Sequence, residues 1–233
     1  MPFNQQNINS HQLCHDSICP FSRKVRILLS EKNIEFTLVN LESWEKKEKF
    51  LIKNPAGRVP IFFDKDNYLF VCEINNIVEY IEEKWCKNNL IGDNLVKRAE
   101  SRRLQSWFDN KFYGDVTKHI LQQRYYGVIN PNSFKPSPNI ISNSTHNLSM
   151  HLKYISSLLE NNTYLAGGGI SIADISAASH ISALDYFGDI KWQNFEIVQN
   201  WYTLVKSRKS FGAILKDKIL GIPPSPHYNK IDF

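Results

Sequence analysis

The hydrophobic pattern of this chain changes character near residue 86, and this change limits the folds that the chain can adopt. Up to that point, short apolar runs typical of strands alternate with amphipathic helical segments. Beyond it the apolar spacing is helical, apart from an Asn-, Pro- and Ser-rich segment at 130–146 that predicts a loop. We therefore expect an α/β domain, a polar linker, an all-helical domain and a Pro-rich tail, at 1–86, 87–94, 95–216 and 217–233.

The elements of the first domain follow the order β-α-β-α-β-β-α. Pro20 suits the first position of a helix, because the N–H that proline lacks would have no partner there. The stripe from Ile74 to Trp85 has the spacing of an amphipathic helix. The element order predicts a parallel crossover followed by an antiparallel hairpin. The other predicted elements are strands at 10–14, Phe36–Leu41, Val59–Phe63 and Tyr68–Cys72, and a short helix at Trp44–Leu51.

The composition is that of an ordinary globular protein. The 233 residues are 42% apolar and 22% charged, which suffices for two modest cores. The sequence contains no uninterrupted run of 18 apolar residues, so it predicts no membrane span. It also shows no signal peptide, and we therefore expect a cytoplasmic protein. The four cysteines lack metal-binding or disulfide spacing, and we expect neither a metal nor a nucleic acid as a partner.

Cys19 lies where a strand ends and a helix begins, in the sequence Cys-Pro-Phe-Ser-Arg. With Pro20 at the first helical position, Cys19 falls at the N-cap. Free backbone N–H groups and the helix dipole can stabilise a thiolate there, which would make Cys19 a nucleophile. The alternative, a small N-cap residue in a partly buried loop, stays open at this point.

A second motif, Gly57-Arg-Val-Pro-Ile, enters a predicted strand. We expect the Val59–Pro60 bond to be cis, although the spacing alone would not predict this. The backbone of Val59 would then lie beside the cysteine loop, where it can pair with an extended thiol peptide. A third motif begins at Ile170, where Ser171 and Asp174 predict a capping box at the start of a core helix.

These motifs together resemble the glutathione transferase family over about residues 10–215. The resemblance implies a thioredoxin-like N-terminal domain and an all-helical C-terminal domain. The cysteine at the helix start is similar to the omega class, in which this cysteine is catalytic, whereas tau-class enzymes have serine. The resemblance makes Cys19 the candidate catalytic residue and Arg58, Val59, Pro60 and Glu73 the candidate glutathione contacts.

Ile74 departs from the family pattern, in which a serine follows the acidic residue. The missing hydroxyl removes a hydrogen bond to the γ-glutamyl carboxylate, which costs about 1.5–3 kcal/mol. Glutathione affinity should therefore fall about tenfold or more. We expect at most weak glutathione binding.

The C-terminal part of the chain resembles one subgroup of this family. Segments around Tyr186, Trp201 and Gly221, and the closing Ile-Asp-Phe, are similar to FzlA-type members of the family, which bind the division protein FtsZ. Residues 200–233 carry a net charge of +4, which suits an acidic partner, although a solvated helix face would look the same. The tail is either a binding element or packing within the fold.

Two functions follow as hypotheses. The first is an FtsZ-binding cell-division regulator with a degenerate glutathione site. The second is a glutathione-dependent transferase or thiol transferase that uses Cys19. By resemblance to the family, we expect a two-fold homodimer in either case.

Overall fold

The computed structural model describes residues 9–40, 51–52, 54–132 and 137–231. The chain divides into two compact units, Met1–Asn89 and Leu90–Phe233, and the boundary falls inside the segment predicted as a linker. In the described part of the chain, no helix has the length and apolar character needed to cross a membrane.

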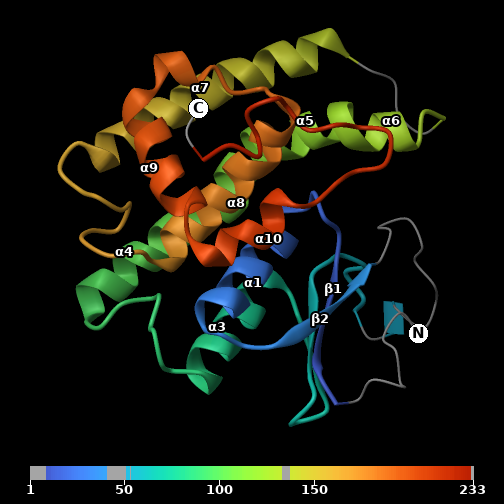
Figure 1. Cartoon of the computed structure of the whole chain (residues 1–233), viewed down its shortest axis with the longest axis vertical. Helices are drawn as coiled ribbons and strands as arrows, with labels where there is room; N and C mark the ends of the chain where they lie inside the picture. The colour runs from blue at the N-terminus through green and yellow to red at the C-terminus, as the bar shows by residue number, and fades with distance from the viewer. Residues whose placement is uncertain (1–8, 41–50, 53, 133–136, 232–233) are drawn as a thin grey trace. The chain divides into compact units, whose positions relative to one another are not determined.

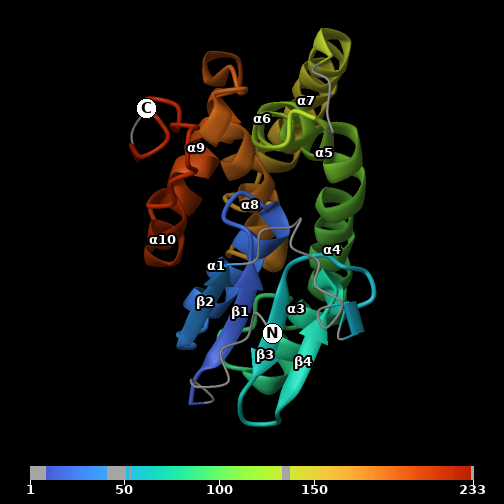
Figure 2. The ribbon, with the colours of Figure 1, turned by 90° about the vertical axis from the view of Figure 1, so that its right-hand side faces the viewer.

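The first unit contains a mixed four-stranded sheet in the order β2-β1-β3-β4 (Figure 2). β1 pairs with β2 in parallel and with β3 antiparallel, and β3 pairs antiparallel with β4. The two central strands are buried along their whole length, whereas both edge strands are partly exposed. The predicted crossover and hairpin are confirmed, with strands at His11–His15, Phe36–Asn40, Ile61–Asp64 and Leu69–Cys72.

Two helices of this unit pack against each other, α1 (Pro20–Glu31) and α3 (Ile74–Lys84). Pro20 occupies the first turn of α1, as expected, and the stripe of α3 buries Ile77, Val78 and Ile81. The thioredoxin-like architecture is thus confirmed. The helix predicted at Trp44–Leu51 lies, except for its last residue, outside the described residues.

The second unit is helical, as predicted (Figure 1). A continuous helical run begins at Leu95 and ends at Ile129, and two of its segments, η2 and η3, are π-helical, which the sequence did not predict. Its segments are α4 (Leu95–Ser106), η2 (Trp107–Thr117), α5 (Lys118–Leu121), η3 (Gln122–Tyr126) and α6 (Gly127–Ile129); then come α7 (Pro138–Leu159), α8 (Ile172–Phe187), η4 (Trp192–Asn194), α9 (Glu196–Lys206), η5 (Lys209–Phe211) and α10 (Gly212–Leu215).

The loop predicted at 130–146 is wrong in its second half, because α7 already begins at Pro138. Proline suits the first turn of that helix. The hydroxyls of Ser144 and Thr145 donate to carbonyls four residues earlier, so these polar side chains are accommodated within the helix. A composition rich in Asn and Ser therefore concealed a helix.

The capping box predicted at the start of α8 is confirmed. The carboxylate of Asp174 accepts hydrogen bonds from the amide and the hydroxyl of Ser171, the amide of Leu165 and the indole of Trp201. Burial raises the pKa of Asp174 although these hydrogen bonds oppose the rise. Asp174 therefore joins the start of α8 to α9 and to the loop before α8, which is a structural role.

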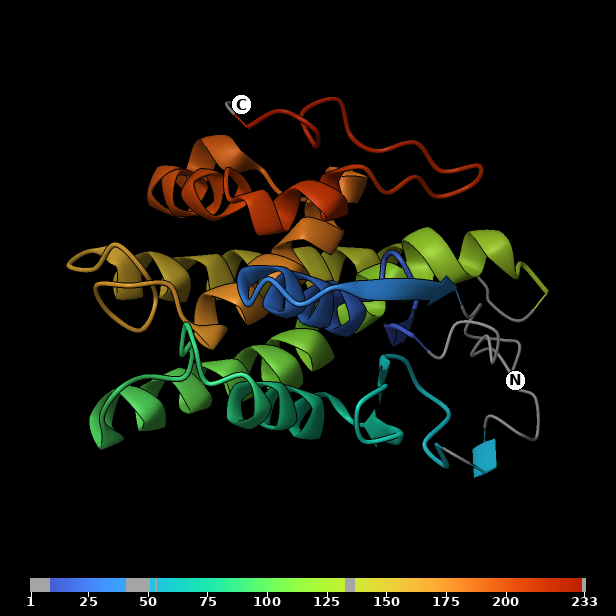
Figure 3. The same cartoon turned by 60° about the horizontal axis from the view of Figure 1, so that its bottom comes forward.

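The tail folds back onto helices of its own unit (Figure 3). Tyr228 is fully buried; its ring lies 5.0 Å from that of Tyr186 in α8, and its hydroxyl donates to the carbonyl of Ile214. His227 hydrogen-bonds to the buried Asp185, at 2.8 Å. The tail is therefore attached to the helices through Tyr228 and His227, although the other described residues of 217–231 are exposed or half-buried, while Asp232 and Phe233 lie outside the described residues.

Candidate ligand-binding site

The site expected from the sequence lies in the first unit, where α1 begins beside the start of β3. Cys19 is the N-cap of α1, with extended backbone angles, and its side chain makes no capping hydrogen bond. Its thiol instead faces the carbonyl oxygen of Val59, with Sγ at 4.0 Å. The structure thus brings Cys19 and Val59 together, as the two motifs predicted.

Cys19 is a protonated thiol at neutral pH. Burial raises its pKa to about 11, and the negative charge of Asp16 adds to the rise, while the polar N–H and O–H groups of Ser22 and Phe21 at the helix start oppose it. Only 8% of the residue is exposed. The N-cap position predicted a stabilised thiolate; the structure differs, because loss of hydration outweighs the backbone N–H groups.

Asp16 and Ser22 shape the cysteine loop, and the sequence analysis did not single them out. The carboxylate of Asp16 accepts from the amide of Ile18 at 3.0 Å, and its carbonyl accepts from the amide of Cys19 at 3.2 Å. The amide of Asp16 donates to the hydroxyl of Ser22. An aspartate three residues before an N-cap cysteine was the signal that could have identified this arrangement.

The Val59–Pro60 peptide bond is cis, as predicted. Val59 packs against a small buried cluster formed by Cys14 and Ile61, which Cys72 also contacts. Cys14, Ile61 and Cys72 face one another across β1, β3 and β4. Val59 therefore packs against the sheet, and its carbonyl oxygen lies next to the thiol of Cys19.

Arg58 and Glu73, two expected glutathione contacts, form an ion pair with each other. The Arg58 guanidinium lies 3.2 Å from the Glu73 carboxylate, and the two side chains are 71% and 45% exposed. Such an exposed pair contributes about 0.2–1 kcal/mol. Glu73 stands at the start of α3 with a positive φ of 66°, a conformation that non-glycine residues seldom adopt.

The start of α3 is poorly equipped to hold a carboxylate. No side chain caps this helix, and Ile74 occupies its first position with an apolar group. The backbone N–H groups of a helix start attract anions, but a hydroxyl among them would add a further donor. Ile74, which departs from the family pattern, therefore lies at the expected glutathione site.

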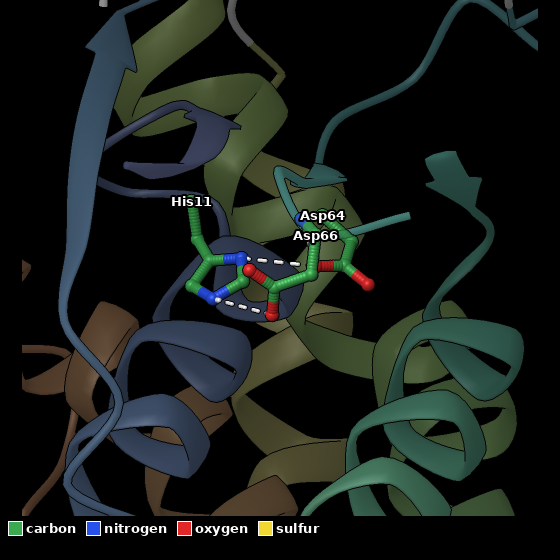
Figure 4. Close-up of side chains that lie close together, drawn as sticks. All are labelled: His11, Asp64 and Asp66. Atoms are coloured by element: carbon green, nitrogen blue, oxygen red, sulfur yellow. Dashed lines mark hydrogen bonds and ion pairs between the residues drawn. The ribbon is translucent and has the colours of Figure 1, made fainter. Parts of the chain in front are cut away.

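A second polar cluster of the first unit consists of His11, Asp64 and Asp66, whose ligand atoms lie within 4.8 Å of one another (Figure 4). The ammonium of Lys84 contacts both carboxylates, and the hydroxyl of Tyr80 donates to Asp64. Lys84 therefore supplies the positive charge that a metal ion would bring. The cluster joins the turn between β3 and β4 to the end of α3.

The directions of the pKa shifts in this cluster agree with Lys84 as its positive charge. Burial lowers the pKa of His11, although both carboxylates act in the opposite direction. Burial alone would raise the pKa of Asp64, but hydrogen bonds from Lys84 and Tyr80 bring it below its ordinary value. The cluster therefore combines a neutral imidazole, ionised carboxylates and an ammonium at neutral pH.

Comparison with known proteins finds a matching family model in each of the two units. Residues 18–84 match the family model described as the N-terminal domain of glutathione S-transferase, and residues 140–217 match its C-terminal domain. A glutathione S-transferase from Rhodospirillum rubrum superposes with a TM-score of 0.92 at 38% identity, covering 96% of this chain and 100% of that one. The chain belongs to the glutathione S-transferase family.

Within this family, the chain is similar over nearly its whole length to FtsZ-localized protein A of Caulobacter vibrioides. The two are 37% identical over 223 residues, which is 95% of this chain and 97% of that protein. The solved structure of FzlA from C. crescentus gives a TM-score of 0.92 and covers 96% of this chain and 100% of that one. Glutathione S-transferase 2 of Saccharomyces cerevisiae is 26% identical, covering 84% of this chain and 86% of that one.

Proposed function

We propose that this protein is an FtsZ-binding regulator of cell division that works in the cytoplasm. The observation that carries the proposal is the 37% identity with FtsZ-localized protein A, which spans 95% of this chain and 97% of that protein. Glutathione S-transferase 2 of yeast is less similar, at 26% identity. A dimer with two-fold symmetry would offer two equal binding surfaces to a filament.

The geometry of the expected glutathione site favours a binding role over transferase activity. The thiol of Cys19 is protonated at neutral pH, Glu73 is paired with Arg58, and Ile74 provides no hydroxyl. Each feature weakens one part of glutathione binding or activation. We therefore propose that glutathione binds weakly, in the millimolar range or above, and that turnover with electrophiles is low.

The charge of the C-terminal region supports an acidic partner, with one correction to the sequence analysis. Lys206, which contributes to the net charge of +4 counted there for residues 200–233, is fully buried and lies 3.5 Å from the carboxylate of Asp185. The exposed cations are Lys209, Lys216, Lys218 and Lys230. Such charges act chiefly on the rate of encounter and on its salt dependence.

Co-sedimentation of the purified protein with FtsZ filaments tests the proposal. We expect the protein to pellet with filaments, and binding to weaken as the salt concentration rises. Reversing Lys216 and Lys218 to glutamate should weaken binding most at low salt, because screening already removes much of their effect at high salt. No pelleting above that of an unrelated transferase at low salt would contradict the proposal.

The role of the tail in binding is best tested with point substitutions, not with truncation. Removing residues after Gly221 would delete Tyr228 and His227 and expose the contacts that they cover on α8. A loss of binding could then follow from damage to the fold. Exposed side chains such as Lys218 separate the two effects, because their replacement leaves the packing intact.

The alternative function, thiol transfer by Cys19, rests on the cysteine at the start of α1 beside the cis Val59–Pro60 bond. If such activity is present, Cys19→Ser should abolish it and leave the melting temperature nearly unchanged. An assay with a mixed disulfide of glutathione measures this. Robust conjugation of a dinitrobenzene substrate at millimolar glutathione would favour the enzyme over the regulator.

A further inference from the structure

The tail contains a tight turn, Ile219–Ile222, that presents one leucine to the solvent. The amide of Ile222 donates to the carbonyl of Ile219 at 3.1 Å, and the two residues form an isolated β-bridge. Gly221 closes the turn with a φ of +77°, which favours glycine. Leu220 at the tip is 97% exposed, the highest value among the large hydrophobic side chains of the described residues.

A buried tyrosine holds this turn from both sides. The hydroxyl of Tyr186 accepts from the amide of Ile219 at 3.0 Å and donates to the carbonyl of Ile222 at 2.7 Å. Tyr186 is itself fully buried in α8, and its carbonyl accepts from the amide of Ser225 at 2.8 Å. The backbone on each side of Leu220 is therefore attached to a core helix.

This attachment has a consequence for binding. Ordering a flexible segment costs free energy when two proteins associate, and a segment that is already held avoids most of that cost. Single exposed apolar residues are common and need no explanation by themselves. Leu220 differs because a dedicated buried hydroxyl holds the turn in a shape that keeps its side chain away from the core.

The charges around the turn indicate the kind of partner. Lys216 and Lys218 precede the turn and are exposed, while Asp217 between them is half-buried. An apolar tip next to exposed cations is complementary to an apolar pocket with an acidic rim. A lipid surface fits less well, because Ile219 and Ile222 are half-buried and one leucine is a weak anchor in a bilayer.

We propose that Leu220 is the anchor residue of the protein-binding surface and inserts into an apolar pocket with an acidic rim on the partner. The inference rests on the proposed function, since it names the FtsZ filament as that partner. Lys216 and Lys218 form the polar rim around the anchor. Desolvated apolar anchors dominate affinity at interfaces, whereas rim charges contribute less to it.

The test compares two leucines that differ in position but are both exposed. Leu220→Ala is expected to raise the dissociation constant for FtsZ filaments about tenfold or more. Leu95→Ala, at the start of α4, removes the same side chain from a position that is 84% exposed, and it should change the constant by less than about twofold. Melting temperature and light scattering should be unchanged for Leu220→Ala.

Each remaining outcome decides between the proposals. If the wild-type protein binds filaments and Leu220→Ala binds equally well, the anchor is refuted and the proposed function stands. If the wild-type protein does not bind filaments, the proposed function fails and the anchor fails with it. Vesicles containing anionic phospholipid form a separate arm; binding to them that depends on Leu220 would replace the protein pocket with a membrane and overturn the inference.

Discussion

Tyr228→Ala tests whether the tail is a structural part of the helical unit. The side chain of Tyr228 is fully buried, contacts the ring of Tyr186 and donates its hydroxyl to the carbonyl of Ile214. The ammonium of Lys206 lies 5.8 Å from its ring centroid. The substitution would therefore open a cavity among α8, α9 and α10 and remove the contact that holds the tail in place.

The size of the effect follows from the buried area. Replacing a fully buried large aromatic side chain with alanine costs about 3–5 kcal/mol, including the cavity. Tyr228→Phe removes only the hydrogen bond to Ile214, which costs about 0.5–1.5 kcal/mol. The two variants together separate the packing of the ring from its polar contact.

Urea denaturation followed by tryptophan fluorescence measures these changes, because Trp192 and Trp201 lie in the same unit. The ring of Trp192 stacks on Tyr202, so its emission should respond to the packing of α9. We expect a lower midpoint with little change in the slope of the main transition. Tyr68→Ala, at a position that is 69% exposed in the first unit, is the control and should leave the transition of the helical unit unchanged.

A loss below about 1 kcal/mol for Tyr228→Ala would refute this reasoning. It would mean that the tail separates from the helices in solution at little cost. The turn that carries Leu220 would then be mobile instead of being held by Tyr186. Binding through the tail would then require the segment to become ordered on contact.

Further predictions concern Cys19, Asp174 and Lys206. The rate of Cys19 alkylation should rise only as the pH approaches about 11. Peptide mass spectrometry measures this rate, with the exposed Cys86 as an internal standard. A rate profile with its midpoint near pH 9 would contradict the burial of Cys19. Because the folded pKa of Cys19 exceeds the unfolded value, its contribution to stability is complete below about pH 9 and is lost as the pH rises through 11. Asp174→Ala should lower the free energy of unfolding by about 3–5 kcal/mol, since several buried donors lose their acceptor; an unchanged urea midpoint would show that water replaces the carboxylate. Lys206→Met should cost about 3 kcal/mol by leaving Asp185 without its buried cation, and Lys206→Arg should restore part of this if charge is the cause.

The order of the two domains and several local features could be predicted from the sequence. Strand and helix periodicity identified the crossover, the hairpin and most of the helices, because each repeat reports on neighbouring residues. The capping box was identified from the motif of Ser171 and Asp174, whereas the cis bond before Pro60 was expected because the resembled fold places one there. The resemblance of these motifs to one family then supplied the arrangement that the periodicity alone could not.

Other features depended on residues far apart in the chain. The first half of α7 was concealed because serine and asparagine favour loops by composition, and only packing decides whether a helix continues through them. The pairing of Arg58 with Glu73 required that β3 and α3 be placed. Neither could be obtained from local pattern.

The sequence by itself determined where Cys19 and the basic residues near the end of the chain lie along the helices. Only the tertiary structure decided their charge state and exposure. Cys19 stays protonated because distant residues exclude water from it, and Lys206 is buried because α8 brings Asp185 to it. Solvation depends on every group that packs around a side chain, whereas the local pattern records only its neighbours along the chain.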